Sequence, residues 1–99
     1  MSQMMLTGAN RTSLPALYST DGQGMNAIAQ VRYFWGGAGE MLVTEFDGED
    51  TLYGYFPNTG DGEWGYASLR EFTASNRGQI NGCERDYYFT PATVGDATN

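Results

Sequence analysis

The stretch from Glu40 to Tyr66 constrains the fold of this chain most strongly. It holds three short apolar and aromatic segments, which read MLVTEF, TLYGYF and EWGY, and these are separated by DGED and by a Gly-rich turn. Short segments of this kind, joined by Asp-Gly and Gly-rich turns, are typical of antiparallel strands connected by hairpins. We therefore expect a β-meander at the centre of the chain.

The flanking segments add strands and helices around this meander. Ser68-Leu69-Arg70-Glu71 matches a capping box and predicts a helix over Leu69–Ser75, ended by Asn76-Arg77-Gly78. Thr7 is a suitable cap for a short helical turn over Gly8–Ser13. The expected strands are Ala27–Trp35, Met41–Phe46, Thr51–Phe56, Glu63–Ala67 and Tyr87–Phe89.

Together these elements predict an α+β fold: an antiparallel sheet of four or five strands with one main helix and a short N-terminal helical arm, packed in two layers. A length of 99 residues suits a single domain, 1–99. We expect an ordered core over about residues 6–91. The small and polar residues 92–99 are expected to fray.

The chain is acidic, with a net charge of −7 from 12 Asp and Glu against 5 Lys and Arg. Phosphate repels such a chain, so we expect no direct contact with nucleic acid. The same charge favours a partner protein with a basic surface. A simpler interpretation is that the acidity keeps a small protein in solution.

The chain offers few groups for cofactor or metal chemistry. It has one cysteine, Cys83, and no histidine, so the usual zinc sites and an internal disulfide are excluded, and a reducing compartment fits. We expect no cofactor and no metal. No apolar run approaches the ~20 residues of a membrane span, and no secretory signal is visible, so we expect a cytoplasmic protein without membrane contact.

Acidic and aromatic side chains gather in the first hairpin of the meander, which MLVTEF, DGED and TLYGYF form. No Lys or Arg lies between Arg32 and Arg70. One interpretation is a negative patch that occupies the basic nucleic-acid channel of another protein, with aromatic residues as binding hot spots. The other is a solvated turn beside ordinary cross-strand aromatic pairs. The candidate partner-binding residues are Glu45, Asp47, Glu49, Asp50, Tyr53 and Tyr55.

A second charged group precedes the last predicted strand. Arg85 lies between Glu84 and Asp86, where it suits an ion-pair clamp that ties this segment to the sheet. The two carboxylates could alternatively act as acid and base in a hydrolase that binds a divalent metal. Cys83 has no histidine to activate it and is read as a packed or surface thiol.

Five blocks of the sequence resemble one family of small bacterial proteins, which is catalogued as a domain of unknown function. The blocks are LPALYSTDG at Leu14–Gly22, VRYFW at Val31–Trp35, TEFDGEDTLYGYF at Thr44–Phe56, EWGYASLREF at Glu63–Phe72 and ERDYYFTP at Glu84–Pro91. The resemblance covers about Leu6 to Pro91. Members are typically encoded on plasmids, integrative elements and phages, near antirestriction and conjugation genes. The resemblance therefore implies a fold and a genetic setting, and it implies no catalytic residue.

These observations favour a non-catalytic protein-binding module of a mobile genetic element. In its most concrete form it is an antidefence inhibitor, anti-CRISPR or antirestriction, that binds a host nuclease or CRISPR complex through an acidic and aromatic surface. One alternative is an accessory protein of conjugation or plasmid maintenance, or a homo-oligomer such as a homodimer. A third is a small hydrolase that uses Glu84 and Asp86.

Overall fold

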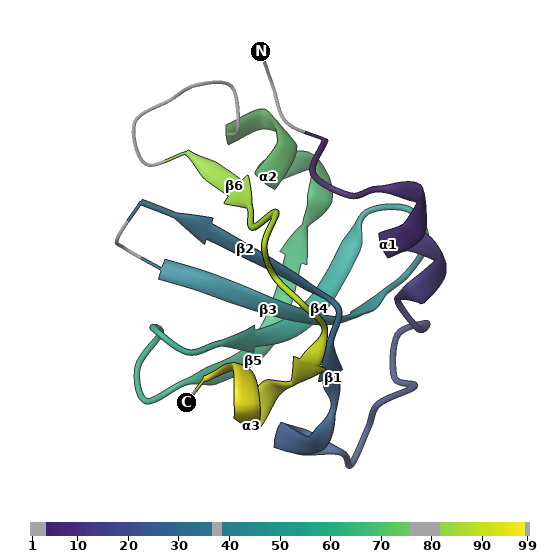
Figure 1. The fold of residues 1–99 in the computed structure, drawn as a ribbon, viewed down its shortest axis with the longest axis vertical. Helices are drawn as coiled ribbons and strands as arrows, with labels where there is room; N and C mark the ends of the chain where they lie inside the picture. The colour runs from purple at the N-terminus through teal and green to yellow at the C-terminus, as the bar shows by residue number, and fades with distance from the viewer. Residues whose placement is uncertain (1–3, 37–38, 76–81, 99) are drawn as a thin grey trace.

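The computed structural model describes residues 4–36, 39–75 and 82–98. Within these ranges the chain has the predicted α+β fold, with a five-stranded antiparallel sheet in the order β5-β4-β3-β2-β6 and a two-stranded sheet of β1 and β7 (Figure 1). The elements are α1 (Gly8–Ser13), η1 (Gly24–Asn26), β1 (Ile28–Ala29), β2 (Val31–Trp35), β3 (Gly39–Phe46), β4 (Thr51–Phe56), β5 (Glu63–Ser68), α2 (Leu69–Ser75), β6 (Cys83–Arg85), β7 (Ala92–Thr93) and α3 (Val94–Ala97).

The central meander is confirmed, and the bounds of its strands change little. α1, β4 and α2 have the predicted bounds, β3 begins two residues earlier than predicted, and β5 ends one residue later. The strand expected over Ala27–Trp35 is divided at Gln30, whose N–H donates to the Val43 carbonyl. The residues before this point form β1, which pairs with β7 and is not part of the large sheet. The predicted end of α2 at residues 76–78 lies outside the described residues.

The last strand of the large sheet is β6, so the strand predicted at Tyr87–Phe89 is wrong. The Asp86 carboxylate accepts the Tyr88 N–H at 2.9 Å, and the Phe89 N–H donates to the Asp86 carbonyl at 3.3 Å. These bonds form a turn immediately after β6. The strand that pairs with β2 is β6, in which Cys83 lies opposite Trp35 and is buried.

Residues 92–99 were expected to fray, and over the described residues 92–98 this prediction is also wrong. Val94 is fully buried, and its N–H donates to the Ala27 carbonyl at 2.9 Å. The Thr93 hydroxyl caps α3 by accepting the Asp96 N–H at 3.1 Å. A single apolar anchor, a cap and the pairing with β1 therefore hold a segment whose composition is small and polar. Figure 1 shows α3 beside β1.

A β-bulge at Thr44 decides which way the side chains of β3 point. Val43 pairs with Gly54 and Glu45 pairs with Tyr53, so Thr44 is an extra residue between them. The bulge puts Glu45 on the same face of the sheet as Leu42, although strict alternation would separate them. Gly54 is required here, because a Cβ at this position would collide with the Leu42 carbonyl oxygen.

The large sheet has two faces with different covers. We call the face that packs against the segment around α1 and against α2 the helix face, and the opposite face the loop face. The helix face carries the main core, which contains Met5, Leu6, Leu14, Val31, Tyr33, Met41, Val43, Phe46, Leu52, Leu69 and Cys83. The loop face carries a smaller core of Ala29, Leu42 and Val94, with Tyr55, Trp64, Phe89 and Ala97 packed against it.

No helix in the described ranges has both the length and the apolar character needed to cross a membrane.

Candidate binding site

Glu45 was expected in an exposed acidic patch, and this placement is wrong. Its side chain is 2% exposed on the loop face. It accepts the Tyr18 N–H at 2.7 Å and the Thr20 N–H at 2.8 Å, and it also accepts the Thr20 hydroxyl. Because a buried carboxylate is tolerated only with such donors, Glu45 fixes the loop around Thr20 to the sheet.

The loop that Glu45 holds has an unfavourable backbone at one position. Tyr18 has a φ of 71°, in the left-handed region that a residue with a side chain seldom adopts. This conformation costs about 1 kcal/mol or more. The hydrogen bond from the Tyr18 N–H to Glu45 helps to offset that cost, and the Tyr18 side chain is presented to solvent with 65% exposure.

Asp47 and Asp50 also have structural partners. One Asp47 carboxylate oxygen accepts the N–H groups of Glu49 and Asp50 at 2.8 Å and of Thr51 at 3.0 Å, and these bonds, the one from Glu49 first, lower the Asp47 pKa. Asp47 therefore stabilises the hairpin turn, while Glu49 is exposed in that turn.

Asp50 connects the same turn to the start of α2. It accepts the Arg70 N–H at 2.7 Å and the Ser68 hydroxyl at 2.8 Å. These contacts, the Arg70 N–H first, lower the Asp50 pKa. The Ser68 hydroxyl accepts the Glu71 N–H at 3.2 Å, which is one half of the predicted capping box, and Asp50 adds a second acceptor from the hairpin turn.

Aromatic side chains gather on the loop face over β4 and β5. We call Tyr18, Tyr53, Tyr55, Trp64 and Tyr66 the aromatic cluster. The Tyr53 ring stacks on Trp64 with 5.7 Å between centroids and an 18° interplanar angle, and it lies 5.0 Å from the Tyr66 ring. A hydrogen bond with Tyr18 is the largest cause that raises the Tyr66 pKa. Tyr66 is 54% exposed, so the cluster reaches the surface.

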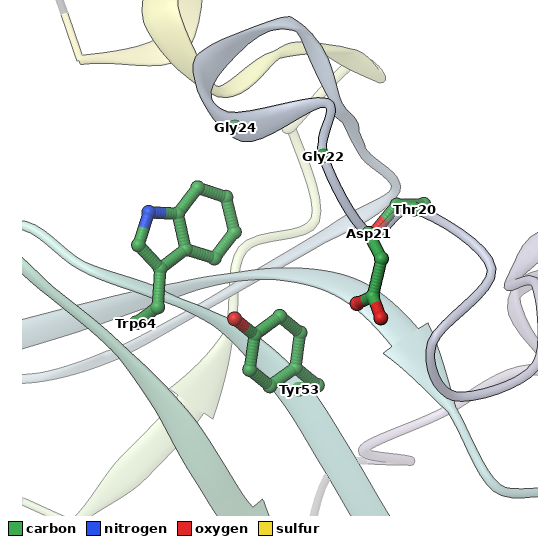
Figure 2. Close-up of a pocket in the computed structure, with 6 residues that line it drawn as sticks. All are labelled: Thr20, Asp21, Gly22, Gly24, Tyr53 and Trp64. Carbon is green, nitrogen blue, oxygen red and sulfur yellow. The ribbon is translucent and has the colours of Figure 1, made fainter.

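A pocket of about 300 Å³ opens between this cluster and the loop that Glu45 holds. Its lining residues are Thr20, Asp21, Gly22, Gly24, Tyr53 and Trp64. Figure 2 shows the Asp21 carboxylate, the Tyr53 ring and the Trp64 indole around a common space, with Gly22 and Gly24 on the loop side. The two aromatic rings come from the sheet, and the carboxylate comes from a loop more than thirty residues earlier in the chain.

The predicted partner-binding residues are thus only partly brought together. Tyr53 lines the pocket, and Tyr55 packs beside it with its ring 5.2 Å from Trp64. Glu49, Asp47 and Asp50 lie in the hairpin turn and its connection to α2. The sequence analysis did not select Asp21 or Trp64. The only signals for them were the Asp-Gly turn at Asp21 and the aromatic content of β5.

The arginines in the described part of the chain have contacts away from this pocket. Arg32 forms ion pairs with Glu40 at 2.6 Å and Asp86 at 3.1 Å, which is a clamp between β2, β3 and the end of β6. The Arg70 guanidinium lies 3.5 Å from Asp50. The remaining two lie over aromatic rings, Arg11 over Phe46 and Arg85 over Tyr87. None of these four lines the pocket.

The groups considered for catalysis have structural surroundings. Asp86 holds Arg32 and the turn after β6, while Glu84 is exposed. Burial raises the pKa of the Cys83 thiol to about 12, which keeps it protonated and unreactive at neutral pH. Among the described residues there is no group of three or more His, Cys, Asp or Glu placed to hold a metal ion.

Comparison with known proteins gave no further assignment: no family model matches this chain, and neither the curated proteins nor the solved structures contain a match.

Proposed function

We propose that this protein is a non-catalytic module that binds another protein with a basic surface, and that the aromatic cluster on the loop face forms the contact. The observation that carries the proposal is the exposure of Tyr18 and Tyr66 beside the half-buried Tyr53 and Trp64 on one face. Exposed tyrosine and tryptophan side chains on a rigid strand pair supply large contact area at little entropic cost and are enriched at protein interfaces.

The distribution of charge supports a basic partner. The net charge is −7, and the four described arginines are engaged with carboxylates, aromatic rings or backbone. The carboxylate of Asp21 lies at the edge of the aromatic cluster. A negatively charged aromatic surface would steer a basic partner toward itself and would repel nucleic acid.

The finer form of the proposal is an antidefence protein of a mobile genetic element, which binds a host nuclease or CRISPR complex and blocks its nucleic-acid site. Its support is the sequence resemblance together with the acidity of the chain. Expressing the protein in cells with an active defence system should raise the survival of incoming DNA. If survival stays unchanged with nuclease and CRISPR systems alike, this finer form is wrong, while partner binding is tested separately.

Affinity capture with matched variants tests the general proposal. The tagged wild-type protein is incubated with a bacterial host lysate at low and high salt, beside Tyr66→Ser and Tyr88→Ser. Tyr66 is 54% exposed in the cluster, and Tyr88 is 93% exposed outside it, so the two variants remove the same group from different surfaces.

We expect a basic protein that is retained by the wild type and by Tyr88→Ser, is lost with Tyr66→Ser, and dissociates as salt rises. Equal retention by the two tyrosine variants would contradict the assigned surface. Recovery of the bait alone, together with self-association in solution, would replace the proposal with a homo-oligomer.

A further inference from the structure

We propose that the pocket lined by Asp21, Tyr53 and Trp64 receives the side chain of an arginine presented by the basic partner protein. This inference rests on the proposed function and names the group that the site recognises.

The shape of the pocket suits a flat group of limited size. Its volume of about 300 Å³ is at the small end of the range for ligand pockets. The Tyr53 and Trp64 rings are nearly parallel, at 18°, and give a wall of aromatic surface. On the loop side, Gly22 and Gly24 have no side chain to fill the space, and a Cβ at either position would meet nothing within 4 Å. A planar group can therefore lie between the loop and the rings.

The electrostatic environment of the pocket selects a cation. Burial raises the pKa of Tyr53, and the negative charges of Glu45 and Asp21 raise it further. Both carboxylates therefore make the electrostatic potential at the Tyr53 wall of the pocket more negative. Glu45 is occupied by its hydrogen bonds to Tyr18 and Thr20, whereas Asp21 is exposed at the pocket rim. Asp21 is thus placed to pair with a ligand, and Glu45 adds charge behind the aromatic wall.

A guanidinium group matches this set of groups better than other cations or a nucleobase. It is planar, it stacks on tyrosine and tryptophan, and its fork of N–H donors pairs with a carboxylate in two parallel hydrogen bonds. A lysine ammonium would satisfy Asp21 but would leave the flat aromatic surface poorly covered. A nucleobase could stack on the rings, but its phosphate would meet a chain of net charge −7.

The loop is already arranged for such a ligand. Successive turn hydrogen bonds close it, from the Asp21 N–H to the Tyr18 carbonyl at 3.3 Å and from the Gln23 N–H to the Thr20 carbonyl at 3.1 Å. Together with the anchor at Glu45, these bonds fix the Asp21 backbone relative to the β4–β5 rings. Because the loop loses little conformational freedom on binding, the pocket can hold a single side chain with useful affinity.

The test is a titration of the protein with the peptide acetyl-Gly-Arg-Gly-amide, followed by the indole N–H signals in an NMR spectrum. The chain has 2 tryptophans, so Trp35, which packs against the helix-face core, is an internal reference for Trp64. The matched peptides carry lysine or citrulline, and citrulline keeps the shape of arginine without its charge. The variants are Asp21→Asn at the pocket and Glu71→Gln, an exposed acid on α2 outside it.

We expect the arginine peptide to shift the Trp64 signal and to leave the Trp35 signal unchanged. Citrulline should weaken binding by roughly tenfold or more, and Asp21→Asn by about 3- to 10-fold, because each removes one half of a charge-assisted pair. Glu71→Gln should bind as the wild type does. Equal affinity for arginine and citrulline, or no shift of Trp64, would overturn the inference.

Two further outcomes separate this inference from the proposed function. If Tyr66→Ser abolishes partner capture but Asp21→Asn does not, and the arginine peptide does not bind, the pocket assignment fails while the proposed function stands. If the Trp64 signal shifts with protein concentration in the absence of peptide, the occupant is a second copy of the chain, and the partner assignment is wrong.

Discussion

The helix face and the loop face of the same sheet are held together in different ways. On the helix face, apolar side chains from the N-terminal segment and from α2 pack on the strands, and the Tyr33 hydroxyl donates to the Met5 carbonyl at 2.6 Å. On the loop face, three small or medium side chains form the core, and a buried carboxylate holds the adjacent loop. One face is organised by apolar area, and the other by a few directional hydrogen bonds.

This difference allows a small protein to combine a stable sheet with the binding surface that we propose. Apolar burial is non-directional and stabilises the sheet as a whole. Hydrogen bonds to Glu45 fix the position of the loop without covering the aromatic cluster. The loop face can keep Tyr18 and Tyr66 at the surface because the larger apolar core lies on the helix face.

The largest loss of stability is expected from a substitution in the helix-face core. Leu52→Ala removes a fully buried side chain from the main core and should lower the free energy of unfolding by about 3 kcal/mol. Val94→Ala, at the equally buried loop-face position, removes fewer carbon atoms and should cost about 1–2 kcal/mol. Urea unfolding of both variants measures the two values. A larger loss for Val94→Ala than for Leu52→Ala would reverse the assigned roles of the two faces.

The next largest loss of stability is expected at the buried carboxylate of Glu45. Glu45→Gln replaces an acceptor oxygen with an NH₂ group that cannot accept the loop N–H groups, so it should lower the free energy of unfolding by about 1–3 kcal/mol. Hydrogen exchange should show faster exchange at Tyr18 and Thr20, with little change on the helix face.

Glu40→Gln is the matched control for this variant. Glu40 lies on the same strand but pairs with Arg32, and both side chains are about a quarter exposed. Loss of this partly screened ion pair should cost less than about 1 kcal/mol and should leave the exchange at Tyr18 and Thr20 unchanged. If Glu40→Gln loosens the loop as much as Glu45→Gln does, the loop does not depend on Glu45.

A smaller effect is expected at the cap of α3. Thr93→Ala removes the hydroxyl that accepts the Asp96 N–H and should cost about 1 kcal/mol. The loss should be confined to the C-terminal segment and be visible as faster exchange of the Thr98 and Val94 N–H groups. Thr7→Ala, which removes the corresponding cap of α1, is the helix-face counterpart and should leave those two N–H groups unaffected.

The smallest effect is an acid dependence of the hairpin turn between β3 and β4. Asp47 and Asp50 have pKa values lowered from 3.8 by hydrogen bonds in the folded state. Their stabilisation is therefore complete above this ordinary value and is lost as the pH falls through the lowered pKa. Asp47→Asn should flatten the fall in thermal stability below about pH 4. An equally steep fall in wild type and variant would contradict this.

Local signals in the sequence were sufficient for much of the fold. Thr7 and Ser68 cap the two predicted helices, and the Asp47-Gly48 turn produces the hairpin between β3 and β4. These features depend on neighbouring residues, so the sequence reveals them directly. The same is true of the alternation in β4, where Leu52 faces the main core and Tyr53 the opposite side.

The missed features depend on contacts between distant segments. The bulge at Thr44 turns Glu45 toward the loop face, and no turn residue marks it in the sequence. The docking of Val94 depends on Ala29 and Leu42, more than fifty residues earlier. For the same reason, the pocket between Asp21 and Trp64 was not predicted: it exists only because Glu45 fixes the loop beside β5.

Hydrogen–deuterium exchange of the free protein and of its complex with the captured partner tests the central claim most directly. We predict that the partner slows exchange in residues 18–24 and along β4 and β5, and leaves the exchange of α1 and α2 unchanged. This result would place the partner on the aromatic cluster of the loop face. Slower exchange on α1 and α2, with residues 18–24 unaffected, would contradict the division of the molecule into a stabilising face and a binding face.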